Sequence, residues 1–124
     1  MQKTVSIKDR FKGPPKSANG GYASGLLASM FEGGVDVSLH LPPPLDTDMI
    51  LTRDGDKATL MWGDKLVGTA TAKECTLEVP PLPNPLVLGI NPADAEGAPG
   101  AFTPFATCFV CGESRDHGDG LCLE

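Results

Sequence analysis

The stretch from Gly13 to Met30, GPPKSANGGYASGLLASM, contains residues suited to chemistry on a ligand. Its apolar spacing predicts a helix whose first turn holds Asn19-Gly20-Gly21. The first N–H groups of a helix lack partners and carry a partial positive charge, so they can stabilise an oxygen that becomes negative. Glycine lets a ligand approach these amides, although it weakens a helix by about 1 kcal/mol relative to alanine. The alternative is an ordinary helix start, capped by Ser17 or Asn19, with glycines for packing.

Side chains that could act as a catalytic base lie outside this stretch. Hydrolysis needs a general base or a nucleophile, and the nearest carboxylates in the sequence are Asp9 and Glu32, one on each side. Asp36, Ser38 and His40 alternate along a predicted strand, where such side chains point in parallel. We therefore interpret these three residues as a solvated or inter-subunit face rather than as a catalytic set.

Cysteines near the C-terminal end offer a second kind of chemistry. Cys108, Cys111, His117 and Cys122 follow a C-x2-C-x5-H-x4-C spacing, one residue away from that of a zinc knuckle. Zinc takes four such ligands, but the spacing is off and the surroundings are acidic, so we expect no metal and keep zinc as an alternative. A redox dithiol needs a nearby helix N-terminus, and the local sequence predicts none.

The net charge of −6 lies almost entirely in the C-terminal third of the chain. An acidic chain lacks the basic face that nucleic acids require, so we expect no nucleic-acid partner. The sequence contains no apolar run of about 18 residues and no apolar signal segment, so we expect no membrane association. We expect a cytoplasmic protein with reduced cysteines. Lys12 and Lys16 belong to a locally basic arm that could contact a phosphorylated small molecule.

Hydrophobic periodicity predicts one strand and then one helix in the first third of the chain. The segment KTVSIKDRF alternates weakly, which indicates a short strand. A helix is predicted over residues 20–32, because its apolar side chains are spaced for a wide buried face. Gly33-Gly34 is expected to end this helix.

Four further strands are predicted after the helix. Residues 35–41, VDVSLHL, alternate strictly between apolar and polar side chains. Asp54-Gly55 and Gly63-Asp64 are turn pairs that separate three more strands, the last expected over residues 65–79. Small residues between Gly68 and Ala72 give that strand a smooth face on which a helix can pack closely.

These patterns predict an α+β domain of order β-α-β-β-β-β over residues 1–79. From Pro80 the composition changes, and residues 80–104 hold seven of the twelve prolines. We expect residues 80–124 to form an extended tail with the Cys-x-x-Cys motif, packed on the domain or on a partner subunit.

Three motifs of the chain occur together in one family. GPPKSANGGYASGLLA, VSLHLPPPLD and the later CFVCG…GDGL resemble the N-terminal repeat of double-hotdog members of a thioesterase-like, acyl-CoA-binding hotdog family. The resemblance covers roughly residues 10–123. It implies a long helix wrapped by a curved antiparallel sheet, and an acyl thioester such as a coenzyme A thioester as the ligand, without a separate cofactor. It also implies a homodimer or higher homo-oligomer here, in place of the second repeat.

The resemblance also implies which residues form the site. In hotdog thioesterases the helix N-terminus stabilises the thioester oxyanion, which points to the amides of Gly20, Gly21 and Tyr22. Asn19 would orient the carbonyl or cap the helix. Asp46 lies in the matching motif and would be a catalytic carboxylate near the dimer partner, or else a turn residue. The residues expected to contact the ligand are Ser17, Gly20, Tyr22, Lys12 and Lys16.

The sequence therefore predicts a thioesterase-like protein that binds an acyl thioester at a dimer interface. Hydrolysis stays open, because no base can be assigned beside the helix start. One alternative is a non-catalytic ligand-binding or interaction scaffold that lacks the second repeat. A zinc-stabilised interaction tail is a further alternative.

Overall fold

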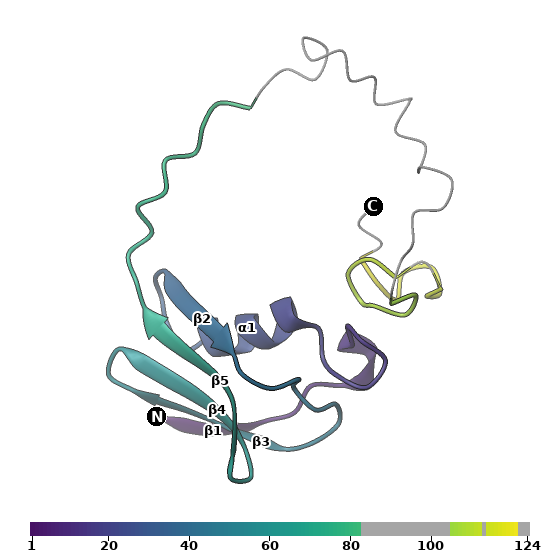
Figure 1. The fold of residues 1–124 in the computed structure, drawn as a ribbon, viewed down its shortest axis with the longest axis horizontal. Helices are drawn as coiled ribbons and strands as arrows, with labels where there is room; N and C mark the ends of the chain where they lie inside the picture. Colours follow the sequence, from purple (N-terminus) through teal and green to yellow (C-terminus); the bar gives the residue numbers. More distant parts are fainter. Residues whose placement is uncertain (83–104, 113, 122–124) are drawn as a thin grey trace.

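The computed structural model describes residues 1–82, 105–112 and 114–121 (Figure 1). Within them the chain forms one α-helix and a five-stranded sheet in the expected order β-α-β-β-β-β. No helix among these residues has the length and hydropathy needed to cross a membrane. The elements are β1 (Gln2–Val5), the 3₁₀ turn η1 (Asp9–Phe11), α1 (Gly20–Ala28), β2 (Val35–Leu39), β3 (Met49–Asp54), β4 (Lys57–Trp62) and β5 (Lys65–Ala72).

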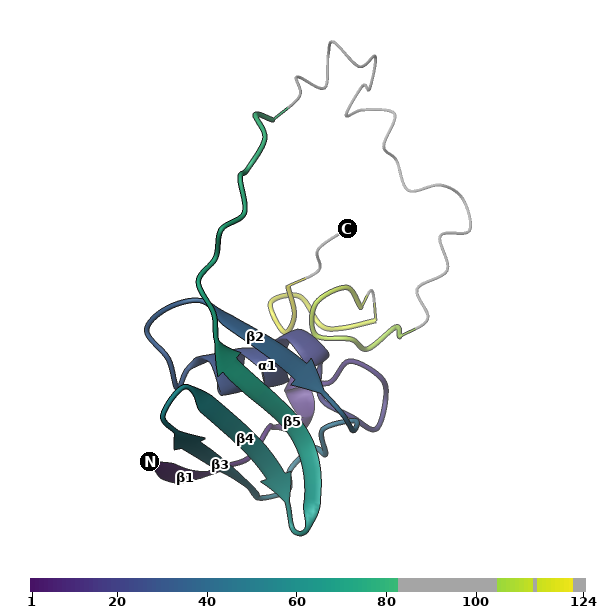
Figure 2. The same cartoon turned by 60° about the vertical axis from the view of Figure 1, so that its left-hand side comes forward.

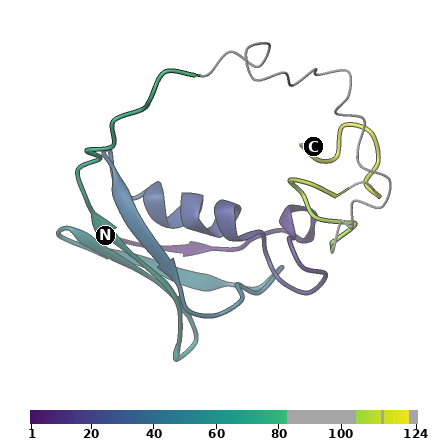
Figure 3. The same ribbon diagram turned by 45° about the horizontal axis from the view of Figure 1, so that its top comes forward.

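The sheet is antiparallel throughout, with the strand order β1-β3-β4-β5-β2. It curves around α1, which lies along its concave face (Figure 3). The two hairpins turn at the predicted positions, where Gly55 and Gly63 have φ values of +58° and +59° that favour glycine. This arrangement is consistent with a hotdog-like α+β fold.

The core lies between α1 and the sheet. Apolar residues alternate along the strands, so that every second side chain points toward the helix. Gly68 of β5 gives the closest approach, because a Cβ there would lie 2.9 Å from Leu27 Cδ1 of α1. The buried apolar residues are Ile7, Ala18, Ala23, Leu27, Met30, Met49, Leu51, Ala58, Leu60, Val67 and Ala70.

The helix ends four residues earlier than the apolar spacing predicts. The hydroxyl of Ser29 donates to the Leu26 carbonyl at 2.7 Å, and the Phe31 amide donates to the Ala28 carbonyl, so the last turn tightens. Arg53 of β3 donates to the Met30 carbonyl and stacks over the Phe31 ring, 4.4 Å from its centroid. After Ser29 the amides of Met30 and Phe31 thus bond three rather than four residues back, and Arg53 takes the Met30 carbonyl.

Three strands are also shorter than expected. The N-terminal strand ends at Val5, and the residues expected to extend it form η1. β2 ends at Leu39 rather than at residue 41. β5 ends at Ala72 rather than at residue 79, because its partner β2 begins at Val35, which pairs with Ala72. Residues 73–82 are exposed and form no regular element.

The C-terminal residues 105–121 return to the helix start (Figure 2). The Phe109 amide donates to the Lys12 carbonyl at 2.8 Å, and the Phe109 ring packs edge-on against Phe11 at 4.9 Å. Phe11 in turn stacks on Tyr22 of α1 at 4.3 Å. Residues 83–104 of the expected proline-rich tail lie outside the described residues. We call residues 105–121 the docked segment below.

Candidate functional site

The loop before α1 is folded back on itself, and this sets the position of the helix start. The Gly13 amide donates to the Ser17 carbonyl, and the Asn19 amide donates to the Phe11 carbonyl at 2.8 Å. The close approach favours glycine at position 13, since a Cβ there would make a tight contact, 3.1 Å from Asn19 Cα. These backbone hydrogen bonds therefore hold the first turn of α1 in a defined position.

Asn19 is the N-cap residue of α1. Its Oδ1 accepts the Tyr22 amide at 3.1 Å, which is the side-chain cap that the sequence offers as the alternative to a role toward the ligand. The Tyr22 amide is thereby occupied. Its Nδ2 donates to the Cys108 sulfur of the docked segment at 3.7 Å. Both ends of the Asn19 side chain thus have protein partners.

An apolar groove begins at the helix start. It has a volume of about 380 Å³ and lies between the loop before α1 and the chain that leaves β2. The Ala18 amide donates to the Pro43 carbonyl at 2.9 Å and joins these two walls. The lining residues are Pro14, Ser17, Ala18, Gly20, Leu39, His40, Leu41, Pro42 and Pro43.

The groove reaches Gly20, the first residue of α1. No acceptor among the described residues takes the N–H of Gly20 or of Gly21. A Cβ at Gly20 would make only an ordinary contact, 3.5 Å from Leu39 Cδ1, so packing alone does not require glycine there. Of the candidate residues at the helix start, Ser17 and Gly20 line the groove, whereas Gly21 and Tyr22 do not.

The predicted acidic and basic residues lie elsewhere. Asp46 is exposed, adopts a φ of +47°, and donates its amide to the Ile7 carbonyl, which is the geometry of a turn residue. It does not line the groove. The Lys12 ammonium lies 2.7 Å from the Asp9 carboxylate. Lys16 is exposed in the loop between the groove-lining residues Pro14 and Ser17.

His40 is a groove residue that the sequence pattern does not identify as one. Its Nε2 lies 3.1 Å from Thr69 Oγ1 of β5, on the polar face of the sheet where the alternation places it. The same residue lines the groove, because the chain turns away from β5 directly after Leu39. The sequence pattern does not show where the chain turns after Leu39, so it could not have placed His40 in the groove.

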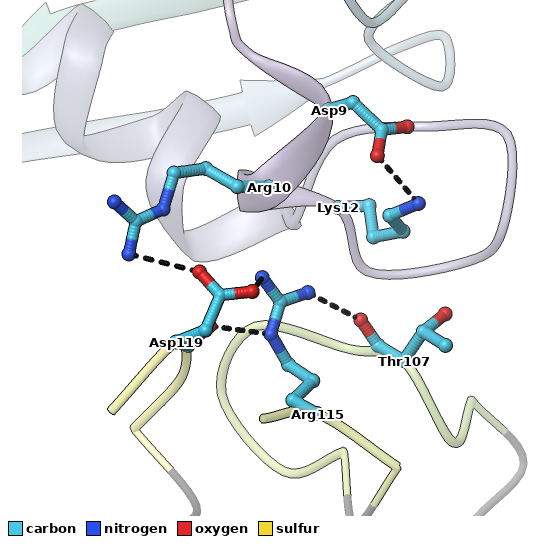
Figure 4. A network of polar contacts seen from close by, with 6 residues as sticks. All are labelled: Asp9, Arg10, Lys12, Thr107, Arg115 and Asp119. Atoms are coloured by element: carbon cyan, nitrogen blue, oxygen red, sulfur yellow. Dashed lines mark hydrogen bonds and ion pairs between the residues drawn. The ribbon is translucent and has the colours of Figure 1, made fainter. Parts of the chain in front are cut away.

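Charged side chains of the docked segment and of η1 lie together in one network, in which the Arg10–Asp119 pair joins the two (Figure 4). The Arg115 side chain is 5 % exposed and donates to the Thr107 carbonyl at 2.8 Å and to the Asp119 carboxylate at 2.9 Å. Asp119 also pairs with Arg10 at 3.1 Å. Arg10, Lys12 and Arg115 each have an acidic or carbonyl partner already. We therefore interpret the network as a structural contact rather than as a binding site for an anion.

The Cys-x-x-Cys pair of the docked segment lies beside the N-terminus of α1. Cys108 is 5 % exposed and Cys111 is exposed, and both are free thiols. Among residues 1–82, 105–112 and 114–121, no three His, Cys, Asp or Glu side chains gather as metal ligands, so His117 does not join this pair. Cys122 of the expected zinc spacing lies outside the described residues.

Comparison with known proteins found little similarity at the level of sequence. No family profile matches the chain, and no curated protein matches it. Among solved structures, the chain is similar to the crystal structure of a thioesterase superfamily protein, with 20% sequence identity and a TM-score of 0.47. That match covers 56% of this chain and 47% of the other, so the chain spans about half the length of that protein.

Proposed function

We propose that this protein binds an acyl thioester, such as an acyl-CoA, in the groove beside the start of α1. The observation that carries this proposal is the apolar groove of about 380 Å³ that ends at Gly20. An acyl chain is apolar, and its thioester carbonyl is a hydrogen-bond acceptor. The groove offers both an apolar wall and, at its end, the Gly20 amide, which has no acceptor among the described residues.

The residues at the helix start divide into donors and supports. The amide of Gly20, which lines the groove, is the donor to the thioester oxygen, aided by the partial positive charge of the helix end. Asn19 supports them as the cap, and its side chain does not orient the carbonyl. Lys16 is the lysine that meets the coenzyme phosphates, because Lys12 is paired with Asp9.

Binding is better supported than hydrolysis. None of the described residues that line the groove is a carboxylate. Thioester hydrolysis in the hotdog family that the sequence resembles uses a carboxylate. A second copy of the chain that brought Asp46 to the groove would supply it. Without that contribution, the protein is a ligand-binding scaffold.

A homodimer completes the proposal. β2 is an edge strand, and no described strand lies along its outer side. Leu39 and Leu41 at its end are 37% and 39% exposed, next to the groove. Pairing of β2 with β2 of a second copy would cover this edge and would place the partner beside the groove. We expect the complex in a reducing compartment such as the cytoplasm.

The test compares two glycine substitutions on the same helix. Binding of a panel of short, long and aromatic acyl-CoA thioesters is measured by calorimetry for the wild type, Gly20→Ala and Gly25→Ala. We expect Gly20→Ala to weaken binding about tenfold, or ~1.4 kcal/mol, because its methyl group obstructs the amide. Gly25→Ala is the matched control, since a Cβ there meets nothing within 4 Å.

Two results would contradict the proposal: no member of the panel binds, or Gly20→Ala binds as tightly as Gly25→Ala. A thiol-release assay on the same panel separates binding from hydrolysis. If thiol is released, Asp46→Asn abolishes the release only where a second copy brings that carboxylate to the groove. Sedimentation velocity between 1 and 100 µM, as the approximate range, checks the dimer on which this depends.

A further inference from the structure

The docked segment carries two thiols of unlike exposure on one turn. The Gly112 amide donates to the Cys108 carbonyl at 2.9 Å, which closes the turn from Cys108 to Gly112. Residues three apart in such a turn lie near one another. Cys108 is buried against the protein, and Cys111 faces solvent. The pair therefore has one thiol that reagents can reach and one that is shielded.

The protein holds the buried thiol in place from both sides. The Phe109 amide donates to the Lys12 carbonyl, and the Leu121 amide donates to the Phe109 carbonyl, each at 2.8 Å. The side-chain Nδ2 of Asn19 donates to the Cys108 sulfur at 3.7 Å. The sulfur thus lies at the N-cap of α1, a setting that supports a thiolate.

The electrostatics of the pair favour a thiolate on the shielded residue. Burial by itself raises the pKa of the Cys108 thiol, but hydrogen bonds from the Cys111 and Val110 amides, the Cys111 side chain and Asn19 outweigh it, so that its pKa is lowered. The pKa of Cys111 is raised, first because its side chain hydrogen-bonds to Cys108, and also by desolvation and the Cys108 charge. Of the two thiols, Cys108 is therefore the one that loses its proton at the lower pH.

We propose that Cys108 and Cys111 form a reversible dithiol–disulfide pair that exchanges with low-molecular-weight disulfides and controls how firmly the docked segment is held at the helix start. The Cys108 thiolate accepts the proton of Cys111 as the exposed Cys111 sulfur attacks one sulfur of the small disulfide, whose S–S bond breaks and releases one thiolate. Cys108 then passes this proton to the released thiolate, attacks the Cys111 sulfur and expels the second thiolate. Two protein thiols are oxidised, and one disulfide is reduced to two thiols.

Oxidation changes the contact with α1. A disulfide sulfur bears no negative charge and is a poor acceptor, so the hydrogen bond from Asn19 Nδ2 is weakened. The hold of residues 105–121 on the helix start loosens accordingly. In a reducing compartment such a disulfide is transient, as a reversible switch requires.

The experiment uses the full chain with Cys75→Ser and Cys122→Ser, which leaves only this pair. The protein is equilibrated in mixtures of oxidised and reduced glutathione, quenched with acid, and alkylated for mass spectrometry. We expect the species with no alkylated thiol and no glutathione to grow as the mixture becomes oxidising. With Cys108→Ser added, a single glutathione adduct on Cys111 accumulates instead, because the second step is lost.

Two further measurements test the coupling to α1. Asn19→Ser keeps a capping oxygen but lacks the amide donor, so we expect closure of the disulfide to slow several-fold while the helix signal in circular dichroism is unchanged. Hydrogen exchange at Phe109 and Leu121 is expected to be about tenfold faster in the oxidised protein. The proposal is overturned if Cys111 keeps its adduct with Cys108 present, if exchange is unchanged by oxidation, or if one equivalent of zinc binds the pair and blocks oxidation.

Discussion

Asn19 joins three parts of the molecule through one residue. Its Oδ1 caps α1 at the Tyr22 amide, its Nδ2 reaches the Cys108 sulfur, and its own amide donates to the Phe11 carbonyl. A side chain with both ends engaged is poorly placed to move toward a ligand. The amides of Gly20 and Gly21, unlike the side chain of Asn19, have no hydrogen-bond partner among the described residues.

The cap makes a prediction for stability. Asn19→Ala is expected to lower the free energy of unfolding by about 1 kcal/mol, because the Tyr22 amide loses its acceptor. Asn19→Asp keeps a capping oxygen and is expected to retain most of that stability. Urea unfolding followed by circular dichroism measures both, and an equal loss in the two variants would contradict a capping role.

Cys108 makes a prediction for the pH dependence of stability. Its pKa is lowered from the usual 9.0 by hydrogen bonds that outweigh burial. The folded state thus releases this proton at lower pH than the unfolded chain does, so the contribution is lost as pH falls through the folded pKa. Between the lowered folded pKa of Cys108 and about pH 9, the free energy of unfolding is expected to rise with pH. Cys108→Ser should remove this rise, and Cys75→Ser should keep it.

At the scale of elements, the contact between α1 and β5 determines how closely the helix lies against the sheet. Gly68 faces Leu27 of the helix and Leu39 of β2, and a Cβ there would lie 2.9 and 3.0 Å from their methyl groups. The predicted smooth face is confirmed at this residue. Leu39 is also a groove residue, so the packing of β5 influences one wall of the groove.

Gly68→Ala is therefore expected to destabilise the domain by about 1–3 kcal/mol, the cost of overpacking a filled core. Gly25→Ala is expected to have the opposite effect, because Gly25 is exposed on the other side of the same helix. It should raise the free energy of unfolding by about 0.5–1 kcal/mol. Thermal and urea unfolding of the two variants measure the difference. Equal effects would show that the contact between α1 and β5 is looser than described.

At the scale of the whole molecule, the docked segment closes the chain onto its own beginning. Phe109 packs on Phe11, and Arg115 is buried between the Thr107 carbonyl and Asp119, which also pairs with Arg10. The exposed Arg10 pair contributes little by itself. The Arg115 fork holds Thr107 and Asp119 together within the docked segment. The segment contacts the domain through the aromatic pair and the Phe109–Lys12 hydrogen bond.

Arg115→Ala is expected to loosen the fold of residues 105–121, because Thr107 and Asp119 of the same segment lose their shared donor. The surface that meets the domain then loses its shape. Hydrogen exchange at the Phe109 and Leu121 amides should become roughly tenfold faster or more, while exchange in β3 and β4 is unchanged. Arg10→Ala is the matched control at an exposed cation. If the Arg115 and Arg10 variants behave alike, the buried fork within the segment does not maintain the shape by which the segment docks.

Local patterns were sufficient for most elements of the domain. The turn glycines Gly55 and Gly63 and the start of α1 at Gly20 lie where the sequence predicts them. The end of the helix was wrong by four residues, because Arg53 takes the Met30 carbonyl from another strand. The end of β5 was wrong because β2, its partner, begins only at Val35.

The sequence by itself determined the order of elements, the hairpin turns and the capped, glycine-rich helix start. These depend on neighbours within a few residues, through the periods of the helix and the strand. The tertiary structure alone decided that Leu39 and His40 line a groove with Gly20, and that Cys108 meets Asn19 across 89 residues. Such contacts form only when the chain closes on itself, and no local period records which distant segments then meet.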